Sequence, residues 1–172
     1  MLKAAGACLV VAAAAGIGMS FSADLKKRCS ELRMLKQMIY MLRGEIKYTK
    51  TPLPEAFSHI AVRLPEPFSL FLNGTAERMR RMEGETLGEI WRDQIKKDLA
   101  ASHLSRQDKE QLATLGEILG YLDLEMQLSA VDLYLEQLES GIRQAQEDAG
   151  EKRKLYQTLG VAGGIFLVIL LL

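Results

Sequence analysis

The side chains best suited to metal or acid–base chemistry are few and scattered. Glu55 and His59 stand four residues apart, which places both on one face of a helix and could hold a metal ion. No third ligand stands near them, so an ordinary surface pair is the favoured interpretation and a metal-dependent hydrolase is the alternative. Asp93 and Asp98 fall in a helix-surface pattern, without the burial that would tune one as an acid and the other as a base.

Signatures of nucleotide binding and of nucleophilic catalysis are absent from the sequence. No glycine-rich loop leads into Lys-Ser or Lys-Thr, as a P-loop requires, and no nucleophile elbow stands out among the serines. Cys8 lies in an apolar run and Cys29 among basic residues, which argues against a disulfide and against a cysteine metal site. We therefore expect a protein without catalytic residues and without a cofactor, and not an enzyme.

The charge balance excludes a general attraction to nucleic acid. The 22 basic residues equal the 22 acidic ones, and aromatic residues make up only 6% of the chain, so both an overall positive field and a stacking surface for bases are lacking. One charged cluster is dense, and it comprises Arg78, Arg80, Arg81, Glu83 and Glu85. It is most simply a solvated helix face and turn, and a docking patch for a partner protein is the alternative.

The two longest helices are expected at the ends of a central segment, residues 24–154. Apolar residues recur every three or four positions over residues 24–51. The last helix has a 3.5-residue period, suited to a long and nearly parallel partner. Its seam consists of Leu124, Leu128, Val131, Leu135, Leu138, Ile142, Ala145 and Ala149. We expect these two helices to form an antiparallel pair, and a homodimeric coiled coil is the alternative use of the seam.

Four shorter helices are expected between them, over residues 54–63, 66–82, 87–102 and 105–120. Prolines at 52 and 54 end the first long helix and begin the first short one. Asn73-Gly74 could interrupt the second, and Ser105 with Asp108 resembles a capping box at the start of the fourth. No strand-like alternation competes, so the central segment is predicted to be an all-α helical bundle.

Both ends of the chain are apolar enough to suggest transmembrane helices, over residues 1–23 and 155–172. As helices the two uncharged runs would extend roughly 27–30 Å, close to the thickness of a bilayer core. Basic residues flank both runs on the side of the central segment, at 26–28 and 152–154. The positive-inside bias then places the central segment in the cytoplasm. A cleaved signal peptide is the alternative for the first run, and the core of an oligomer is the alternative for the second.

Small residues in these runs could let the two helices approach each other closely. Gly160 and Gly164 form a Gly-x-x-x-Gly pair, and Ala12 with Gly16 forms a comparable pair in the first run. Glycine and alanine are also simply frequent in membrane helices, so both interpretations stay open.

Two stretches in this order resemble the stage III sporulation protein AB family. The first is Thr-Pro-Leu-Pro-Glu-Ala-Phe at 51–57, and the second is Leu-Gly-Glu-Ile-Leu-Gly-Tyr-Leu-Asp at 115–123. The positions that carry the second stretch are Leu115, Gly116, Leu119, Gly120, Asp123 and, one turn later, Gln127. The opening apolar run with Leu-Lys-Lys-Arg at 25–28 is also similar to the family, so the resemblance covers nearly the whole chain.

The resemblance implies a cytoplasmic domain similar to the F domain of type II secretion and type IV pilus platform proteins. It also implies a place in the mother-cell-derived outer forespore membrane, with the central domain in the mother-cell cytoplasm. There the protein would dock a cytoplasmic secretion-type ATPase of the same operon to a channel between mother cell and forespore, with other channel components and membrane lipid as further partners. A self-associating membrane scaffold without ATPase coupling is the alternative. The family offers no catalytic residues to transfer.

The glycine motif at 115–123 also has a structural interpretation, which we favour over a binding role. Gly120 is expected to adopt a left-handed backbone conformation where its helix ends, and Gly116 is expected to permit close helix contact. Asp123 suits the N-cap of the last helix.

Overall fold

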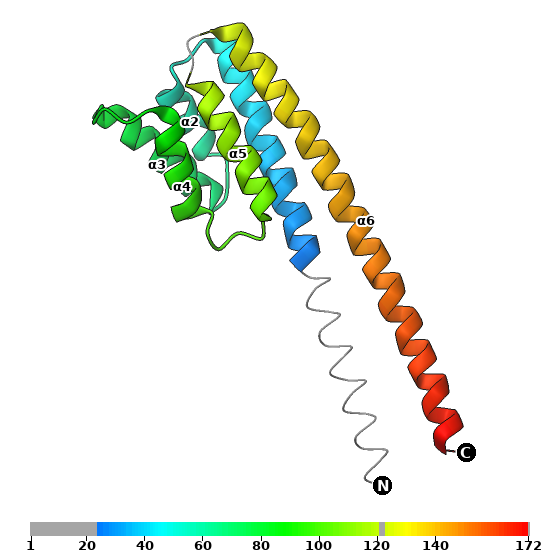
Figure 1. Cartoon of the computed structure of the whole chain (residues 1–172). Helices are drawn as coiled ribbons and strands as arrows, with labels where there is room; N and C mark the ends of the chain where they lie inside the picture. Colours follow the sequence, from blue (N-terminus) through cyan, green and yellow to red (C-terminus); the bar gives the residue numbers. More distant parts are fainter. Residues whose placement is uncertain (1–23, 121–122, 172) are drawn as a thin grey trace. The chain divides into compact units, whose positions relative to one another are not determined.

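The computed structural model describes residues 24–120 and 123–171, with side chains described to residue 151 except at 149. All regular secondary structure in these residues is helical (Figure 1). The chain divides into two compact units. One is Ser30–Ile142, and the other combines Met1–Cys29 with Arg143–Leu172. The charged cluster and the glycine motif predicted from the sequence fall in Ser30–Ile142. The all-helical architecture of this unit confirms the all-α part of the predicted fold class.

The first long helix spans residues 24–44 and continues as a π-helical turn, η1 (Glu45–Thr49). It ends at Lys50, where φ is +52° and the backbone turns left-handed, just before the first proline. Its apolar stripe is buried as the periodicity predicts, at Cys29, Leu32, Leu35, Met38, Ile39, Leu42 and Ile46. The predicted first helix is thus confirmed to within two residues of its end.

The four shorter helices are α2 (Leu53–Ala61), α3 (Phe68–Arg81), α4 (Leu87–Asp98) and α5 (Arg106–Leu119). In sequence order they pack as neighbours: α2 against α3, α3 against α4, and α4 against α5 (Figure 1). Each buries one apolar face, as its period of three to four residues predicts. All four predicted helices are confirmed.

α3 runs through Gly74 without a break, so the potential interruption at Asn73-Gly74 does not occur. The glycine serves instead as a point of close approach. A Cβ at position 74 would lie 2.9 Å from the Cδ of Gln94, a buried side chain on α4. The missing side chain therefore lets α4 pack tightly on α3, which outweighs the cost of a glycine inside a helix.

Capping boxes begin both α4 and α5. Thr86 Oγ1 accepts a hydrogen bond from the Glu89 backbone N–H, and the Glu89 carboxylate accepts one from the Thr86 N–H at 2.8 Å. Ser105 and Asp108 form the same reciprocal pair at α5, which confirms the sequence prediction there. The box at Thr86 follows the same Ser/Thr-x-x-acid spacing and was overlooked.

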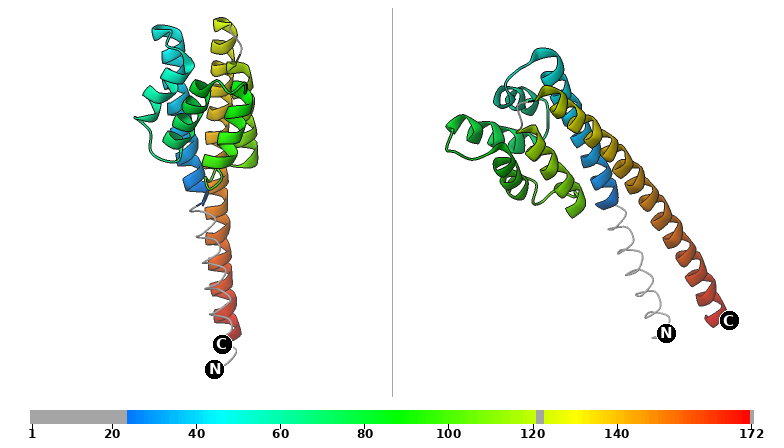
Figure 2. Two further views of the ribbon diagram at one scale, coloured as in Figure 1. Left: turned by 90° about the vertical axis from the view of Figure 1, so that its left-hand side faces the viewer. Right: turned by 45° about the horizontal axis from the view of Figure 1, so that its top comes forward.

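The last helix is α6 (Leu124–Leu171), and its first part, residues 124–142, packs along residues 30–44 in the antiparallel direction. Two ion pairs show this direction. As the first helix advances from Lys36 to Arg43, the paired residue on α6 goes back from Glu139 to Asp132. Lys36 Nζ lies 2.7 Å from Glu139 Oε1, and Arg43 Nε lies 2.5 Å from Asp132 Oδ1. Figure 2 shows the blue-to-cyan helix beside the yellow start of α6. The predicted antiparallel pair is confirmed.

The core of Ser30–Ile142 is centred on Trp91 of α4, which is fully buried. Its ring lies 5.3 Å from that of Phe57 and 4.6 Å from that of Phe71, the latter edge to face. The indole Nε1 donates to the Leu112 carbonyl at 2.8 Å. One tryptophan thereby connects α2, α3, α4 and α5.

The predicted N-terminal transmembrane helix, residues 1–23, lies outside the described residues, as does residue 172. The backbone of residues 155–171 continues α6, but the contacts predicted for Gly160 and Gly164 fall where side-chain environments are not described. In the part of the chain that the structure describes, no helix combines the length and hydrophobicity needed to cross a membrane.

Candidate functional site

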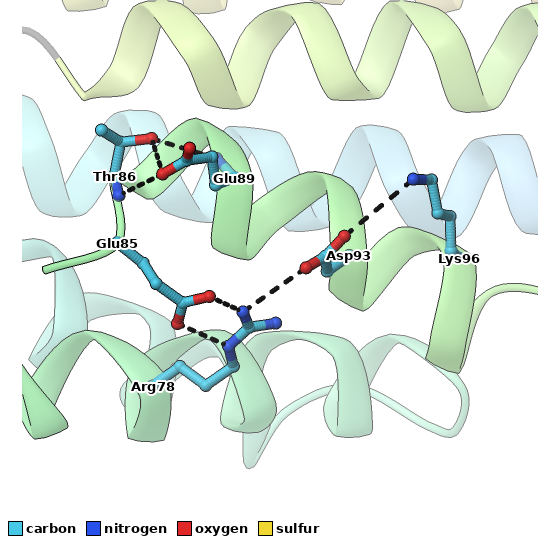
Figure 3. Close-up of polar contacts among 6 residues, drawn as sticks. All are labelled: Arg78, Glu85, Thr86, Glu89, Asp93 and Lys96. Atoms are coloured by element: carbon cyan, nitrogen blue, oxygen red, sulfur yellow. Dashed lines mark hydrogen bonds and ion pairs between the residues drawn. The ribbon is translucent and has the colours of Figure 1, made fainter. Parts of the chain in front are cut away.

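Arg78, the first member of the predicted charged cluster, is the centre of an ion-pair network between α3 and α4 (Figure 3). Its guanidinium binds Glu85 through two nitrogens, one of them 3.1 Å from Glu85 Oε2, and lies 3.5 Å from Asp93 Oδ2. Asp93 in turn lies 4.0 Å from Lys96 Nζ. The bond to Glu85 is the main reason why the pKa of Arg78 is raised. This arginine is therefore satisfied within the chain, and it holds the α3–α4 connection against α4.

Arg80 points away from that network, toward α2. Its Nη2 donates to the Pro54 carbonyl at 3.0 Å and to Ser58 Oγ at 2.9 Å, and its Nε lies 3.9 Å from Glu55. The two arginines thus act as separate clamps, one from α3 to α4 and the other from α3 to α2.

The rest of the cluster occupies the turn after α3. Arg81 and Glu83 are exposed, and neither forms an ion pair within the described residues. Between them Met82 is left-handed, with φ at +52°, and 88% exposed. Of the five predicted residues, Arg78 and Glu85 therefore contact each other, Arg80 contacts α2, and Arg81 and Glu83 are exposed to solvent. This arrangement favours the solvated-turn interpretation over a docking patch.

The potential metal pair Glu55 and His59 is used in other contacts. Glu55 is the carboxylate beside Arg80, and His59 Nδ1 lies 3.8 Å from Glu45 Oε1. Among the described residues no group of three or more His, Cys, Asp or Glu side chains is arranged to hold a metal ion.

Gly116 permits a close contact, as predicted, and its neighbour is Trp91. A Cβ at position 116 would lie 2.8 Å from the Trp91 Cβ and closer still to its Cγ and Cδ1. Leu115 and Leu119 of the same motif are buried beside it. The first half of the glycine motif is therefore a packing device that brings α5 against the core tryptophan.

The predicted left-handed conformation of Gly120 is wrong. Its φ and ψ are −70° and −13°, in the right-handed helical region. A side chain takes the place of a left-handed cap, because Gln127 Nε2 donates to the Leu119 carbonyl at 3.0 Å and satisfies a free acceptor at the helix end. A Cβ at position 120 would make only ordinary contacts, the nearest at 3.5 Å.

Asp123 caps α6, as predicted. Its Oδ1 accepts from the Glu125 N–H at 3.1 Å, and its carbonyl accepts from the Gln127 N–H at 3.0 Å. The second half of the motif thus caps two helices: Gln127 caps the C-terminal end of α5, and Asp123 caps the N-terminal end of α6.

A hollow between α4 and α5 was not found by the sequence reasoning. Its volume is about 520 Å³, with apolar residues below and cationic side chains around it. The lining residues are Arg92, Ile95, Lys96, Ala100, Arg106, Lys109, Glu110 and Ala113. The sequence signal was weak, since the cations stand in two pairs at helical spacing, separated by the α4–α5 turn. We call this hollow the α4–α5 groove.

Comparisons with known proteins identify one family by sequence and by structure. The family model for stage III sporulation protein AB matches residues 3–172. Stage III sporulation protein AB of Bacillus subtilis (strain 168) is 28% identical over 172 residues, which is 100% of both chains. A solved structure of stage III sporulation protein AB superposes with a TM-score of 0.67 at 27% identity, covering 72% of this chain and 97% of that chain. The chain therefore belongs to the stage III sporulation protein AB family.

Proposed function

We propose that this sporulation protein is a membrane-anchored platform of a secretion-like channel between mother cell and forespore, where it docks a cytoplasmic secretion-type ATPase to the channel components. Its place would be the outer forespore membrane, with residues 24–154 in the mother-cell cytoplasm. The role is non-catalytic and requires no cofactor. The ATPase and the channel would be its protein partners, and lipid would surround its two apolar ends.

The observation that carries the proposal is the antiparallel register of the two long helices. Lys36 pairs with Glu139, and a Cβ on Gly141 would lie 3.9 Å from Leu32 Cδ1. The positions at which the chain enters and leaves Ser30–Ile142 are therefore at the same end of the helix pair. Two anchors in one bilayer need this arrangement, and it leaves the rest of the helical unit for partners.

The second candidate is a self-associating scaffold. Leu133 and Met126 of α6 are 56% and 51% exposed and line one open hollow together with Ile118, and neighbouring exposed apolar side chains can mark an interaction surface. The seam itself is used within the chain, since Val131, Leu135 and Leu138 are buried. A homodimer would therefore use the outer face of α6 and not the predicted coiled-coil seam.

Binding to the ATPase tests the platform directly. The full chain in nanodiscs of neutral lipid is titrated with the purified ATPase of the same operon, at low and high salt and with and without nucleotide, and empty nanodiscs serve as the control. Saturable binding is the expected result. A failure to bind under all these conditions, with a helical and folded chain, contradicts ATPase docking. A second chain per nanodisc in the absence of the ATPase would favour the scaffold.

A further inference from the structure

The α4–α5 groove combines an apolar floor with four cationic side chains on its rim. Its apolar lining residues, which we call the floor, are Ile95, Ala100 and Ala113; Ile95 is buried, Ala113 half-buried and Ala100 exposed. The cations come in two pairs, Arg92 with Lys96 on α4 and Arg106 with Lys109 on α5, and the only acidic side chain in the lining is Glu110. The lining thus holds four cations and one carboxylate, and Arg92, Lys96 and Arg106 each also contact a carboxylate of the chain, at Glu117, Asp93 and Glu110.

Two rim cations extend into solvent, and two are held more firmly. Side-chain exposure is 93% for Arg106 and 71% for Lys96, whose contact with Asp93 is as long as 4.0 Å. Lys109 Nζ donates to the Ala100 carbonyl at 3.3 Å, and Arg92 binds Glu117 on α5. Lys109 and Arg92 therefore brace the groove. Lys96 and Arg106 extend into solvent, and Arg106, whose Nε lies 2.8 Å from Glu110 Oε1, would exchange this pair within its own helix for a carboxylate of a ligand.

We propose that the α4–α5 groove is a docking site for an acidic, amphipathic helix of a partner protein. Apolar side chains of that helix rest on Ala100 and Ala113, and its carboxylates reach Lys96 and Arg106. The charge of the rim is complementary to such a helix. An amphipathic helix in an apolar groove places its apolar anchors at intervals of three to four residues, with charged residues at the flanks.

The same features distinguish this ligand from a phosphate group or a nucleic acid. A phosphate is bound by donors that converge on one point, whereas the Arg92 and Arg106 guanidiniums bind separate carboxylates, Glu117 and Glu110. None of the lining residues is aromatic, so the groove offers no surface for base stacking. An apolar floor between separated cations fits a helix with both apolar and acidic residues.

A synthetic peptide is the probe, because the natural segment is unidentified. It has about 14 residues, with leucine at every third or fourth position and glutamate at the flanks, and a second peptide has glutamine in place of glutamate. Binding to the full chain in neutral nanodiscs is measured by fluorescence anisotropy at low and high salt. We expect saturable, salt-sensitive binding of the glutamate peptide, about tenfold tighter than that of the glutamine peptide.

Variants locate the binding on the surface. The double variant Lys96→Gln/Arg106→Gln should weaken binding about tenfold at low salt, and Ala113→Phe, which fills the floor without a change in charge, should do so at any salt. The control Arg63→Gln/Arg81→Gln removes the same charge from two exposed side chains outside the groove lining, and should bind as the wild type does. Circular dichroism verifies that each variant is folded.

Several outcomes overturn the inference. One is equal or absent binding of the two peptides by the wild type, and another is a groove variant that binds like its control. A third is a groove variant that loses binding to vesicles of anionic phospholipid while it keeps binding the peptide, because the rim would then be a lipid-binding surface.

The inference does not require the ATPase to be the natural partner, so it and the proposed function can fail separately. If the ATPase does not bind and the peptide still binds through the groove, the platform proposal fails and the groove stands. If the ATPase binds wild type and groove variants alike, and the peptides show no groove dependence, the groove inference fails and the platform stands.

Discussion

Replacement of Gly116 by alanine is the most demanding test of how the core is organised. The new Cβ would lie 2.8 Å from the Trp91 Cβ and closer to the Cγ and Cδ1 of the ring. These atoms are at the base of the side chain, so a change at the tip of the indole cannot relieve the clash. Rings of Phe57 and Phe71 at 5.3 and 4.6 Å block a sideways shift. Either α5 must retreat or Trp91 must leave its position.

The cost follows from three contributions. Overpacking in a tight core costs about 1–3 kcal/mol, and a clash with atoms so near the backbone belongs in the upper part of that range. Displacement of the indole also weakens the Nε1 bond to the Leu112 carbonyl, at about 1 kcal/mol. Alanine is a better helix former than glycine by about 1 kcal/mol, which acts in the opposite direction. We expect Gly116→Ala to lower the free energy of unfolding by about 2–3 kcal/mol.

Gly120→Ala is the matched control, with the same substitution at the other glycine of the motif. Its Cβ would meet nothing closer than 3.5 Å, and the right-handed φ of −70° suits alanine. We expect a change within about 0.5 kcal/mol. Bulky β-branched residues at position 120 should also cost much less stability than they would if this position required a left-handed backbone.

Urea titrations of both variants in the same detergent give the comparison, with fluorescence of the single tryptophan as the signal. If Gly116→Ala costs less than about 1 kcal/mol, or Gly120→Ala costs as much as Gly116→Ala, the packing explanation of the motif is wrong.

Three further changes test other parts of the unit. Tyr134→Phe should raise the free energy of unfolding by about 1 kcal/mol in urea, since the Tyr134 oxygen is buried with no hydrogen-bond partner among the described residues; a loss would mean that the hydroxyl is bonded. Burial raises the pKa of Tyr134, so the phenol ionises first in the unfolded chain. The free energy of unfolding is therefore independent of this ionisation below about pH 10 and falls above it, and Tyr134→Phe should remove that fall. Thr86→Ala removes the α4 cap and should cost about 1 kcal/mol by the same titration, with Thr86→Ser close to wild type. The bond from Arg43 lowers the pKa of Asp132, so this ion pair stabilises the fold above about pH 4 and its effect is lost as the pH falls through the lowered value; Asp132→Asn should flatten this part of a pH–stability profile.

The helices and their ends could be predicted because their causes are local. A period of three to four residues marks the face that each helix buries, and prolines at 52 and 54 mark the break after the first long helix. Ser105 with Asp108 satisfies backbone groups within its own turn. The antiparallel pair could also be predicted, since the first and last helices both have long apolar seams, and these seams can pack along their length when the two helices run in opposite directions.

The glycines were harder to interpret, because a glycine inside a helix is explained by its neighbour and not by its own segment. Gly74 resembles a helix breaker in the sequence, but it makes room for Gln94 of another helix. Gly120 resembles a left-handed cap, but Gln127 satisfies the helix end. Only Gly116 was interpreted correctly, and even there the sequence did not identify Trp91 as its neighbour.

Charge density along the sequence did not show where cationic side chains come together in the fold. The densest cluster drew attention at 78–85, yet Arg78 and Arg80 are used in clamps between helices. The four cations of the α4–α5 groove are sparse in the sequence and come together only when α4 packs against α5. The sequence shows which residues share a face of one helix, because these are three or four positions apart. Which faces of two helices pack together depends on the tertiary structure.

The position of the groove connects the two proposals. Glu31 accepts a hydrogen bond from the His103 backbone N–H at 2.7 Å, and its other oxygen lies 2.9 Å from His103 Nδ1. The α4–α5 turn is therefore fixed beside the start of the first long helix, the end at which both chain connections leave Ser30–Ile142. Within Ser30–Ile142, the Ala100 end of the groove is therefore the end from which both connections continue toward the proposed membrane anchors. An acidic partner helix and anionic head groups would then compete for Lys96 and Arg106, which is why neutral nanodiscs and anionic vesicles must be compared in the same experiment.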